Sequence, residues 1–383
     1  MSQVRPTAVF FGRGGVAGLR GPEGQEKLRI LRQSLDPVFM SLDSADGAEL
    51  KVSVIKLPSS SSPLMAWSAA LLFYCAGARK ALREATNSVP AAIICQSPYE
   101  GFAALAASMF KPRGSRPKIV IEVHGDWRTA GRGYGKGLRR LAAPFAEKAA
   151  KVALDRAGLV RVVGDFTEIL VRQAGYQGRI EKFPAFVDLS DFLATGPAPF
   201  PLSHQAAFVG SLEPVKGPDI LLAAWPRVVR AVPGARLVFA GSGSMEVFLK
   251  KRAEGMGLGP GVEFKGKLSR QSVLRLIDDS CVVVVPSRSE GLGRVIFEAF
   301  ARGRPVVGAR TGGIPELVDH GKNGLLFPRE DASALGEALV DVLGHPQSRE
   351  AMGRAGHAFV GAADPAGQFD KGMAAVARWI SEP

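Results

Sequence analysis

Short apolar runs alternate along the chain with longer stretches in which apolar positions recur at helical spacing. In the first half, the pattern predicts strands at 7–11, 51–57, 91–95, 118–124 and 159–163, and helices at 65–86, 100–110 and 134–156. In the second half, it predicts strands at 206–210, 236–241, 262–266, 281–286, 305–309 and 324–327, and helices at 217–232, 244–255, 269–280, 292–302 and 331–343. Because these strands are apolar at almost every position, they are typical of parallel sheets covered by helices on both faces.

The two series of elements predict two Rossmann-like, doubly wound α/β domains. A chain of 383 residues is too long for one ordinary core. A stretch rich in Pro and polar residues at 194–205 marks the expected boundary. We therefore expect an N-terminal domain at 1–195, a C-terminal domain at 196–360, and a final helix within 361–383 that packs back on the first domain. Ligands of such sheets bind at the carboxyl ends of the strands, so we expect the domains to face each other across a cleft that holds the site.

Composition is that of a folded globular protein, with 46% hydrophobic and 22% charged residues. The net charge of +13 is concentrated in residues 1–195, which hold 27 Lys and Arg against 17 Asp and Glu. An anionic membrane, a phosphorylated small molecule, nucleic acid or a merely solvated basic surface would each account for this excess. We expect no nucleic-acid partner, because the basic residues are not interleaved with aromatic ones.

The cysteines and the apolar runs indicate the compartment. Cys75, Cys95 and Cys281 are widely spaced and odd in number, which argues against a disulfide framework or a cysteine-based metal site. A reduced, cytoplasmic location is expected. The longest apolar run, 63–78, is shorter than the roughly 20 residues of a transmembrane helix.

A basic stretch at 128–156 leaves two interpretations open. Its Lys and Arg residues accompany apolar residues that recur at helical spacing. Such a helix either packs on the core with a solvated basic face or makes peripheral contact with anionic lipid at the inner face of the membrane.

The segment 286–308 carries the most chemical information. A very apolar strand ends at Pro286, a loop follows with Glu290, Gly291 and Gly293, and a helix containing Glu298 begins. Backbone N–H groups at a helix start, together with the positive end of the helix dipole, suit a phosphate group. Glutamates on either side of a bound diphosphate would accept hydrogen bonds from sugar hydroxyls.

The run from Glu290 to Glu298, E-x7-E followed by G-x-P-V-V at 303–307, closely resembles the signature of retaining glycosyltransferases of family four (group 1), which have the GT-B fold. The resemblance is strong over roughly residues 205–345. It implies that Glu298 binds the ribose of a nucleotide and that Glu290 binds the donor sugar. It also implies that Gly291, Leu292 and Gly293 offer N–H groups to the diphosphate.

Further blocks resemble the family in the same order. FVGSLEPVKGPDILLAAW at 208–225 resembles its first strand and loop, which implies that Lys216 neutralises the diphosphate. Many members have Arg where this chain has Ser211, so we expect Lys216 alone, or Arg288 or Arg294 in addition, to supply the positive charge. Gly241 belongs to a glycine-rich turn near the donor, and Lys267 and Leu268 are expected to line the nucleobase pocket.

The first half resembles the family more loosely. IEVHGDWR at 121–128 places His124 at a strand end, where the resemblance implies contact with the donor sugar near the reacting carbon. GRGGVAGLRG at 12–21 resembles the glycine loop in which Gly14 and Gly15 face the acceptor and the donor phosphate. Glu290, His124 and Lys216 are thus the expected catalytic groups.

The resemblance implies a hexosyl transfer with retention of configuration, from a UDP- or GDP-sugar to an acceptor that is a glycan, a lipid or a small molecule. We expect no metal and no other cofactor, because the chain has no D-x-D triplet and no cluster of metal-ligating residues. Two alternatives remain: a sugar-nucleotide epimerase of the same architecture, and a degenerate nucleotide-sugar sensor or scaffold.

Overall fold

A computed structural model describes residues 5–12, 19, 21–41, 52–54, 91–109, 112–128 and 138–382. The predicted helix at 65–86, Gly14, Gly15 and Cys75 lie outside the described residues, as does the part of the basic stretch at 129–137. The chain divides into two compact units. The first unit comprises Met1–Phe186 and Pro365–Pro383, and the second comprises Val187–Asp364.

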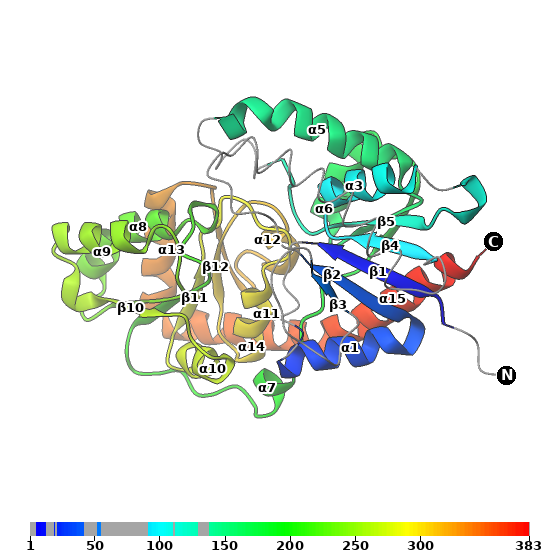
Figure 1. Cartoon of the computed structure of the whole chain (residues 1–383). Coiled ribbons are helices and arrows are strands. Elements are labelled where there is room, and N and C mark those ends of the chain that lie inside the picture. The colour runs from blue at the N-terminus through cyan, green and yellow to red at the C-terminus, as the bar shows by residue number, and fades with distance from the viewer. Residues whose placement is uncertain are drawn as a thin grey trace. The chain divides into compact units, whose positions relative to one another are not determined.

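The first unit contains a parallel sheet of seven described strands (Figure 1). In chain order they are β1 (Thr7–Gly12), β2 (Asp36–Ser41), β3 (Val52–Val54), β4 (Ala92–Cys95), β5 (Lys118–Val123), β6 (Leu159–Val162) and β7 (Arg179–Lys182). Their order across the sheet is β3-β2-β1-β4-β5-β6-β7. The direction of winding therefore reverses between β1 and β4, which is the topology of a doubly wound sheet.

Helices cover both faces of this sheet (Figure 1). They are α1 (Pro22–Ser34), α3 (Pro98–Ser108), α5 (Leu138–Arg156), α6 (Asp165–Gln173) and α15 (Pro365–Ser381). One core joins α3 and α5 to the sheet through residues such as Ala104, Ala153 and Leu154. A second core joins α1 and α15 to the other face through Leu28, Leu31 and other apolar residues.

The second unit contains all six strands predicted for the second half. They are β8 (Gln205–Val209), β9 (Arg236–Ala240), β10 (Val262–Gly266), β11 (Val282–Val285), β12 (Val306–Ala309) and β13 (Gly324–Phe327). All are parallel, in the order β10-β9-β8-β11-β12-β13. The switch of direction lies between β8 and β11, and both strands are buried at nearly every position.

The helices of the second unit follow its strands as the pattern predicted, with short additional helices. They are α7 (Ser190–Leu193), α8 (Pro218–Ala231), α9 (Glu246–Gly255), α10 (Arg270–Asp278), α11 (Arg294–Ala301), α12 (Ile314–Leu317), α13 (Ala332–Gly344) and α14 (Pro346–Ala363). Trp225 on α8 and Phe300 on α11 are completely buried in the core that these helices share with the sheet. The prediction of two Rossmann-like α/β domains is confirmed.

The second unit begins before the Pro-rich stretch, because buried arginines fix that stretch to it. Arg302 donates to the carbonyl oxygens of Phe192 and Thr195, at 2.9 and 2.8 Å. Arg304 donates to the carbonyl oxygens of Ala198 and Pro199, at 2.8 and 2.9 Å. The chain then returns to the first unit at Pro365 as α15, which packs on α1 and β7. Among the described residues, no helix is long and apolar enough to cross a membrane.

Candidate functional site

The switch point of the second sheet brings two loops together. β8 and β11 are hydrogen-bonded neighbours, with Ala206 opposite Val282. The loop after β8 leads to Lys216 and the start of α8, and the loop after β11 carries Glu290 to the start of α11. Both loops lie at the carboxyl ends of their strands, where doubly wound sheets bind their ligands.

Lys216 and Glu290 form an ion pair between these loops. Lys216 Nζ lies 2.7 Å from Glu290 Oε2, and Ser287 Oγ donates to the same oxygen at 3.2 Å. The Lys216 side chain is 32% exposed and that of Glu290 is 13% exposed, so the pair is partly shielded from water. Two of the predicted site residues, 74 positions apart, are therefore in direct contact.

Close backbone packing fixes the loop that carries Glu290. Gly312 has a φ of +57°, and a Cβ there would lie 1.9 Å from the carbonyl oxygen of Glu290. The N–H of Gly313 donates to that same oxygen at 3.1 Å. At Gly217, with a φ of +66°, a Cβ would lie 2.0 Å from the carbonyl oxygen of Pro286. Only glycine permits both the left-handed conformation and this approach.

The start of α11 presents the positive end of a helix beside the ion pair. Gly293 occupies the N-cap in the left-handed conformation and supplies no side-chain cap of its own. Gly291 and Leu292 are partly buried in the loop before it. A helix start of this kind attracts anions through its N–H groups and its dipole.

Glu298 lies one turn into α11 and is partly exposed, whereas Ile296, Phe297 and Phe300 are buried. Glu290 is also partly exposed. The two glutamates are therefore on the solvent-accessible side of this loop and helix, as a ligand-binding role requires.

Arg288 is occupied by structural partners. Its Nη1 and Nη2 bind both carboxylate oxygens of Asp219 at 2.9 and 2.8 Å, and its Nε binds Glu330 at 2.7 Å. The hydrogen bonds to Asp219, followed by that to Glu330, raise the pKa of Arg288 beyond its ordinary value. Burial by itself would raise the pKa of Asp219, but Arg288 outweighs it and the pKa is lowered. The geometry favours a structural role for Arg288, which links its own loop to Asp219 and Glu330. Lys216 is the cation that pairs with Glu290.

The other predicted donor residues lie at the same edge of the sheet. Ser211 and Arg294 are exposed, after β8 and at the start of α11. Gly241 follows β9, and its N–H donates to the carbonyl oxygen of Gly266 at 2.8 Å. After β10, Lys267 is exposed and Leu268 packs on a small apolar cluster under the sheet.

Sequence reasoning did not single out Glu213, which ties two of these loops together. Its carboxylate accepts hydrogen bonds from the backbone N–H and the Oγ of Ser244, at 2.7 and 2.5 Å. These bonds lower the pKa of Glu213. The only available signal was the position of Glu213 in the loop between β8 and Lys216. Within the described part of the chain, no group of three or more His, Cys, Asp or Glu side chains is arranged to hold a metal.

In the first unit, His124 directly follows β5. Its side chain is 42% exposed, and its Nε2 lies 3.2 Å from Oε2 of the buried Glu122. Glu122 in turn binds Arg161 on β6 at 2.7 Å. The structure thus places His124 at the carboxyl edge of its own sheet.

Residues 203–359 match the family model "Glycosyl transferases group 1". The chain is 37% identical over 165 residues to a D-inositol 3-phosphate glycosyltransferase of Segniliparus rotundus, a match that covers 42% of this chain and 37% of the relative. It is also 37% identical over 156 residues to a GDP-mannose-dependent monoacylated alpha-(1-6)-phosphatidylinositol monomannoside mannosyltransferase of Corynebacterium glutamicum, covering 39% of this chain and 40% of the relative. The matches therefore span about two fifths of these curated relatives.

Similarity of fold extends over the whole chain. The structure of a sucrose-phosphate synthase from Thermosynechococcus elongatus aligns with 99% of this chain and 99% of its own, with a TM-score of 0.79 at 18% identity. At that identity the likeness shows the fold alone. Residues 203–359 therefore match the group 1 glycosyl transferases, and the two Rossmann-like units of the chain have the GT-B fold.

Proposed function

We propose that this protein is a retaining glycosyltransferase that transfers a hexosyl group from a UDP- or GDP-sugar without the help of a metal. The observation that carries the proposal is the Lys216–Glu290 pair, 2.7 Å apart, beside the start of α11, whose N-cap is Gly293, at the switch point of the second sheet. A cation and a helix start suit a diphosphate, and an adjacent carboxylate suits the sugar attached to it.

A bound donor would separate this ion pair and provide a new partner for each of its two residues. Its diphosphate would replace the Glu290 carboxylate as the partner of Lys216. Its sugar hydroxyls would replace the Lys216 ammonium as partners of Glu290. The two residues thus offer complementary groups to the two halves of one molecule, while Glu298 would bind the ribose.

The chemical step that we propose retains the configuration of the sugar. The bond from the anomeric carbon to the diphosphate oxygen breaks, and a bond from the same carbon to the acceptor oxygen forms on the same face of the sugar. The acceptor's proton passes to the departing phosphate oxygen. Lys216 and the N–H groups of α11 stabilise the charge that grows on the diphosphate, while Glu290 positions the sugar. His124 would contribute from the first unit.

The relatives suggest which substrates to test first. One of them is named for GDP-mannose and a phosphatidylinositol mannoside, and another for D-inositol 3-phosphate. We propose GDP-mannose as the first donor and inositol-containing phosphates or lipids as the first acceptors.

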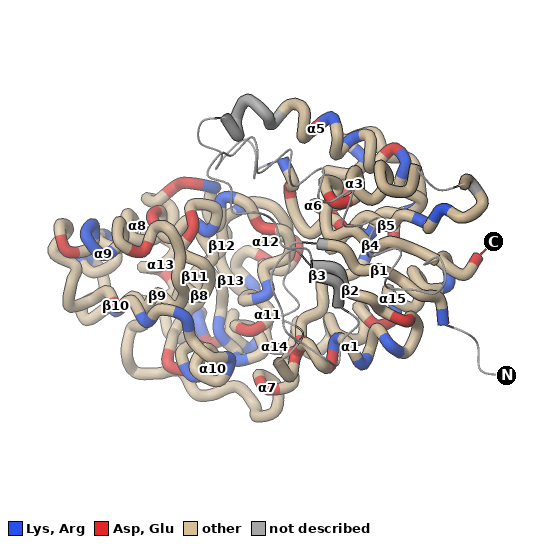
Figure 2. Tube along the Cα trace, viewed as in Figure 1, with Lys and Arg blue, Asp and Glu red and all other residues tan. Residues whose placement is uncertain are grey.

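We also propose that α5 contacts an anionic membrane surface at the cytoplasmic face. Ala146, Ala150 and Leu154 are buried on one side of this helix, whereas Phe145 is 78% exposed on another. Basic positions recur along the exposed part, with acidic ones among them (Figure 2). An exposed aromatic ring next to lysines is typical of helices that lie on anionic lipid. A smaller fraction of the Phe145→Ser variant than of the wild type should sediment with phosphatidylserine vesicles. Equal binding by the wild type and the variant would refute this contact.

The donor site can be tested by a thermal-shift screen of UDP-, GDP- and ADP-sugars, because a ligand that binds the folded state raises the midpoint of unfolding. We expect one class of donor to stabilise the wild type and not Lys216→Ala. Lys250→Ala is the matched control, because Lys250 pairs with Glu246 at the same 2.7 Å on an exposed helix. Stabilisation of all three proteins alike would refute the site.

Turnover distinguishes the alternatives. A transferase releases the nucleoside diphosphate only slowly from donor alone and quickly with an acceptor, whereas an epimerase changes the sugar without an acceptor. A sensor or scaffold would bind the donor and leave it intact.

A further inference from the structure

Two opposite charges are buried face to face in the first sheet. Glu122 on β5 and Arg161 on β6 are opposite each other in the strand register. Their residues are 6% and 2% exposed, and Glu122 Oε1 lies 2.7 Å from Arg161 Nη1. Their neighbours along both strands are buried apolar residues. Burial of such a pair costs more desolvation than an apolar pair of similar size, so its presence needs an explanation.

The second carboxylate oxygen of Glu122 reaches outward to His124. Glu122 Oε2 lies 3.2 Å from His124 Nε2. Burial by itself would raise the pKa of Glu122, but Arg161 and then the His124 hydrogen bond outweigh it, so the pKa lies well below its usual range. Lys27 on α1 adds to this effect. Glu122 is therefore an anion, and as a pure acceptor it requires Nε2 of His124 to carry a proton.

The proton on Nε2 determines whether Nδ1 can accept a hydrogen bond. In the neutral imidazole, a proton on Nε2 leaves Nδ1 as an acceptor. The side chain is 42% exposed, so the ring is accessible to a ligand. Glu122 thus fixes both the tautomer and the orientation of His124.

Arg161 is held by the C-terminal helix as well as by the sheet. Its Nη2 donates to the carbonyl oxygen of Pro184 at 2.8 Å, and its guanidinium carbon lies 4.3 Å from the ring centre of Phe183 and 5.4 Å from that of Phe369. Phe369 belongs to α15, and Gly372 on the same helix leaves room for the Phe183 ring, 2.2 Å from where a Cβ would lie.

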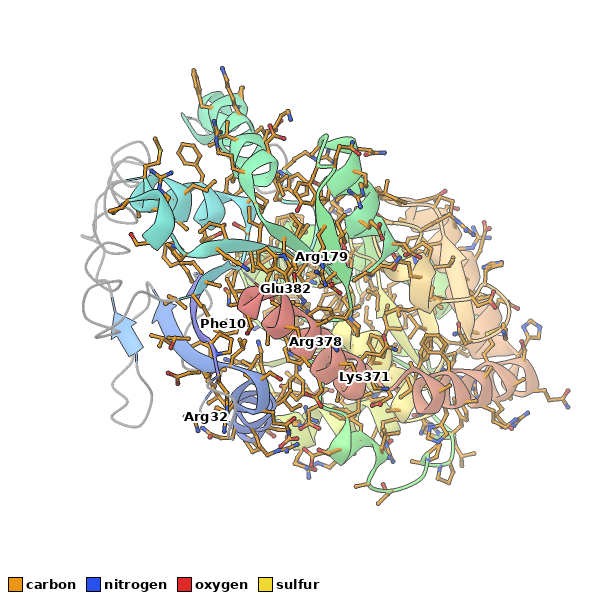
Figure 3. The ribbon with its side chains drawn as sticks, turned by 90° about the vertical axis from the view of Figure 1, so that its right-hand side faces the viewer. Phe10, Arg32, Arg179, Lys371, Arg378 and Glu382 are labelled. Carbon is orange, nitrogen blue, oxygen red and sulfur yellow. The ribbon has the colours of Figure 1, made fainter. Side chains whose placement is uncertain are left out.

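Figure 3 shows how α15 is placed for this role. The helix crosses between α1, which carries Arg32, and β7, which carries Arg179, and Arg179 lies 3.6 Å from Glu382 just beyond the helix end. Lys371 and Arg378 are exposed, while Phe369, Met373 and Val376 are buried against the sheet. A helix that follows the second unit in the chain thus completes the surroundings of a buried pair in the first.

We propose that Glu122 and Arg161 are positioning residues for His124, and that α15 maintains their geometry through Phe369. The consequence for catalysis rests on the proposed function, in which His124 meets the donor sugar. The consequence for the histidine ring does not rest on it. The two are tested separately.

The first test is the tautomer of His124, measured by two-bond ¹H–¹⁵N correlation spectra of histidine side chains in the full-length protein. The chain has five histidines, and the spectrum of His124→Gln assigns the relevant one. We expect the proton on Nε2 in the wild type. The double variant Glu122→Leu/Arg161→Leu removes both charges together, so that no unpaired charge is left in the core. In it, His124 should shift toward a mixture of tautomers, and in Phe369→Ala it should shift in the same direction.

The matched control is Glu26→Gln, which breaks an exposed pair with Arg29 on α1 of the same unit. It should leave the His124 signals unchanged. A wild-type ring with its proton on Nδ1 and none on Nε2, or signals that are the same in the wild type and in a folded double variant, would overturn the proposal.

The second test is kinetic. In the double variant we expect kcat for sugar transfer to fall by up to about 100-fold, the effect of misplacing a group by about 1 Å. The dissociation constant of the nucleoside diphosphate should stay within about two-fold, because Lys216 and α11 belong to the other unit. An unchanged kcat would refute the positioning role. If the wild type transfers no sugar at all, the proposed function fails, and the tautomer alone then decides the positioning proposal.

Discussion

The ion pair between Lys216 and Glu290 makes an unusual prediction: replacement of Glu290 by Gln should strengthen the binding of a nucleoside diphosphate while it abolishes efficient sugar transfer. In the wild type, a diphosphate must draw Lys216 Nζ away from a carboxylate oxygen 2.7 Å away. Glutamine has nearly the same shape but no charge, so Lys216 becomes available to the diphosphate and a nearby negative charge disappears.

The size of the effect follows from the geometry. Two unit charges at this separation interact by about 1.5 kcal/mol in bulk water. The Lys216 side chain is 32% exposed, and partly exposed pairs are worth about 1 kcal/mol after ordering and screening are included. Since 1.4 kcal/mol corresponds to a factor of ten, the affinity for UDP or GDP should rise about five-fold.

Isothermal titration of four proteins tests this reasoning: the wild type, Glu290→Gln, Lys216→Ala and the double variant. Glu290→Gln should bind the nucleoside diphosphate about five-fold more tightly at low salt, with a smaller gain at 1 M salt. Lys216→Ala should bind more weakly than the wild type, and Glu290→Gln should gain less in that background, because only the loss of the carboxylate charge then remains. Transfer by Glu290→Gln should fall about 100-fold or more, since a polar group aimed at the transition state is lost.

The exposed pair Lys250–Glu246 supplies the control, and Glu246→Gln should change neither measurement. Weaker or unchanged binding of the nucleoside diphosphate by Glu290→Gln would show that Lys216 is not the shared partner of carboxylate and diphosphate.

Three further predictions concern stability. Because the pKa of Glu122 is lowered in the folded state, the unfolded state takes up a proton first as the pH falls. The contribution of Glu122 to the free energy of unfolding is therefore complete above about pH 5 and is lost toward lower pH. In urea unfolding between pH 3 and 7, the free energy of unfolding should fall less steeply toward low pH when Glu122 and Arg161 are both Leu. Gly312→Ala should lower the free energy of unfolding by about 1–3 kcal/mol and impair transfer, because a Cβ would collide with the loop that carries Glu290. The control is Gly321→Ala, at a φ of +82° with open space around it, which should lower the free energy of unfolding by only about 1–2 kcal/mol and leave transfer intact. Equal transfer by the two variants would contradict the role of this packing. Gly372→Ala should cost about 1–3 kcal/mol and expose α15 to limited proteolysis, and a variant as resistant as the wild type would show that α15 docks differently.

Elements with a complete local signal could be predicted from the sequence. The run CVVVVP predicted β11, because a strand that is apolar at every position is stable only inside a covered sheet. The glycine-rich loop and the apolar pattern after it predicted α11, because a glycine N-cap and an apolar helical face are local properties. Elements with a weak local signal were not predicted. β2 contains Pro37, and a proline usually argues against a strand. This segment is a strand because it pairs with β1 on one side and with β3 on the other.

The tertiary structure alone decided which distant side chains meet. Lys216 and Glu290 are 74 residues apart, and only the order of β8 and β11 in the sheet places their loops side by side. Arg288 was a candidate for the diphosphate, and only the structure shows that it binds Asp219 and Glu330.

The surroundings of His124 show the same division between sequence and structure. Its position at a strand end was evident from the pattern, since that depends only on neighbouring residues. The buried Glu122–Arg161 pair behind it was not, because partners on different strands are chosen by sheet register. Phe369 joins them only because the chain crosses back to the first unit after Asp364. Local patterns fix elements, but contacts between elements depend on topology, and the chemistry of this protein resides in those contacts.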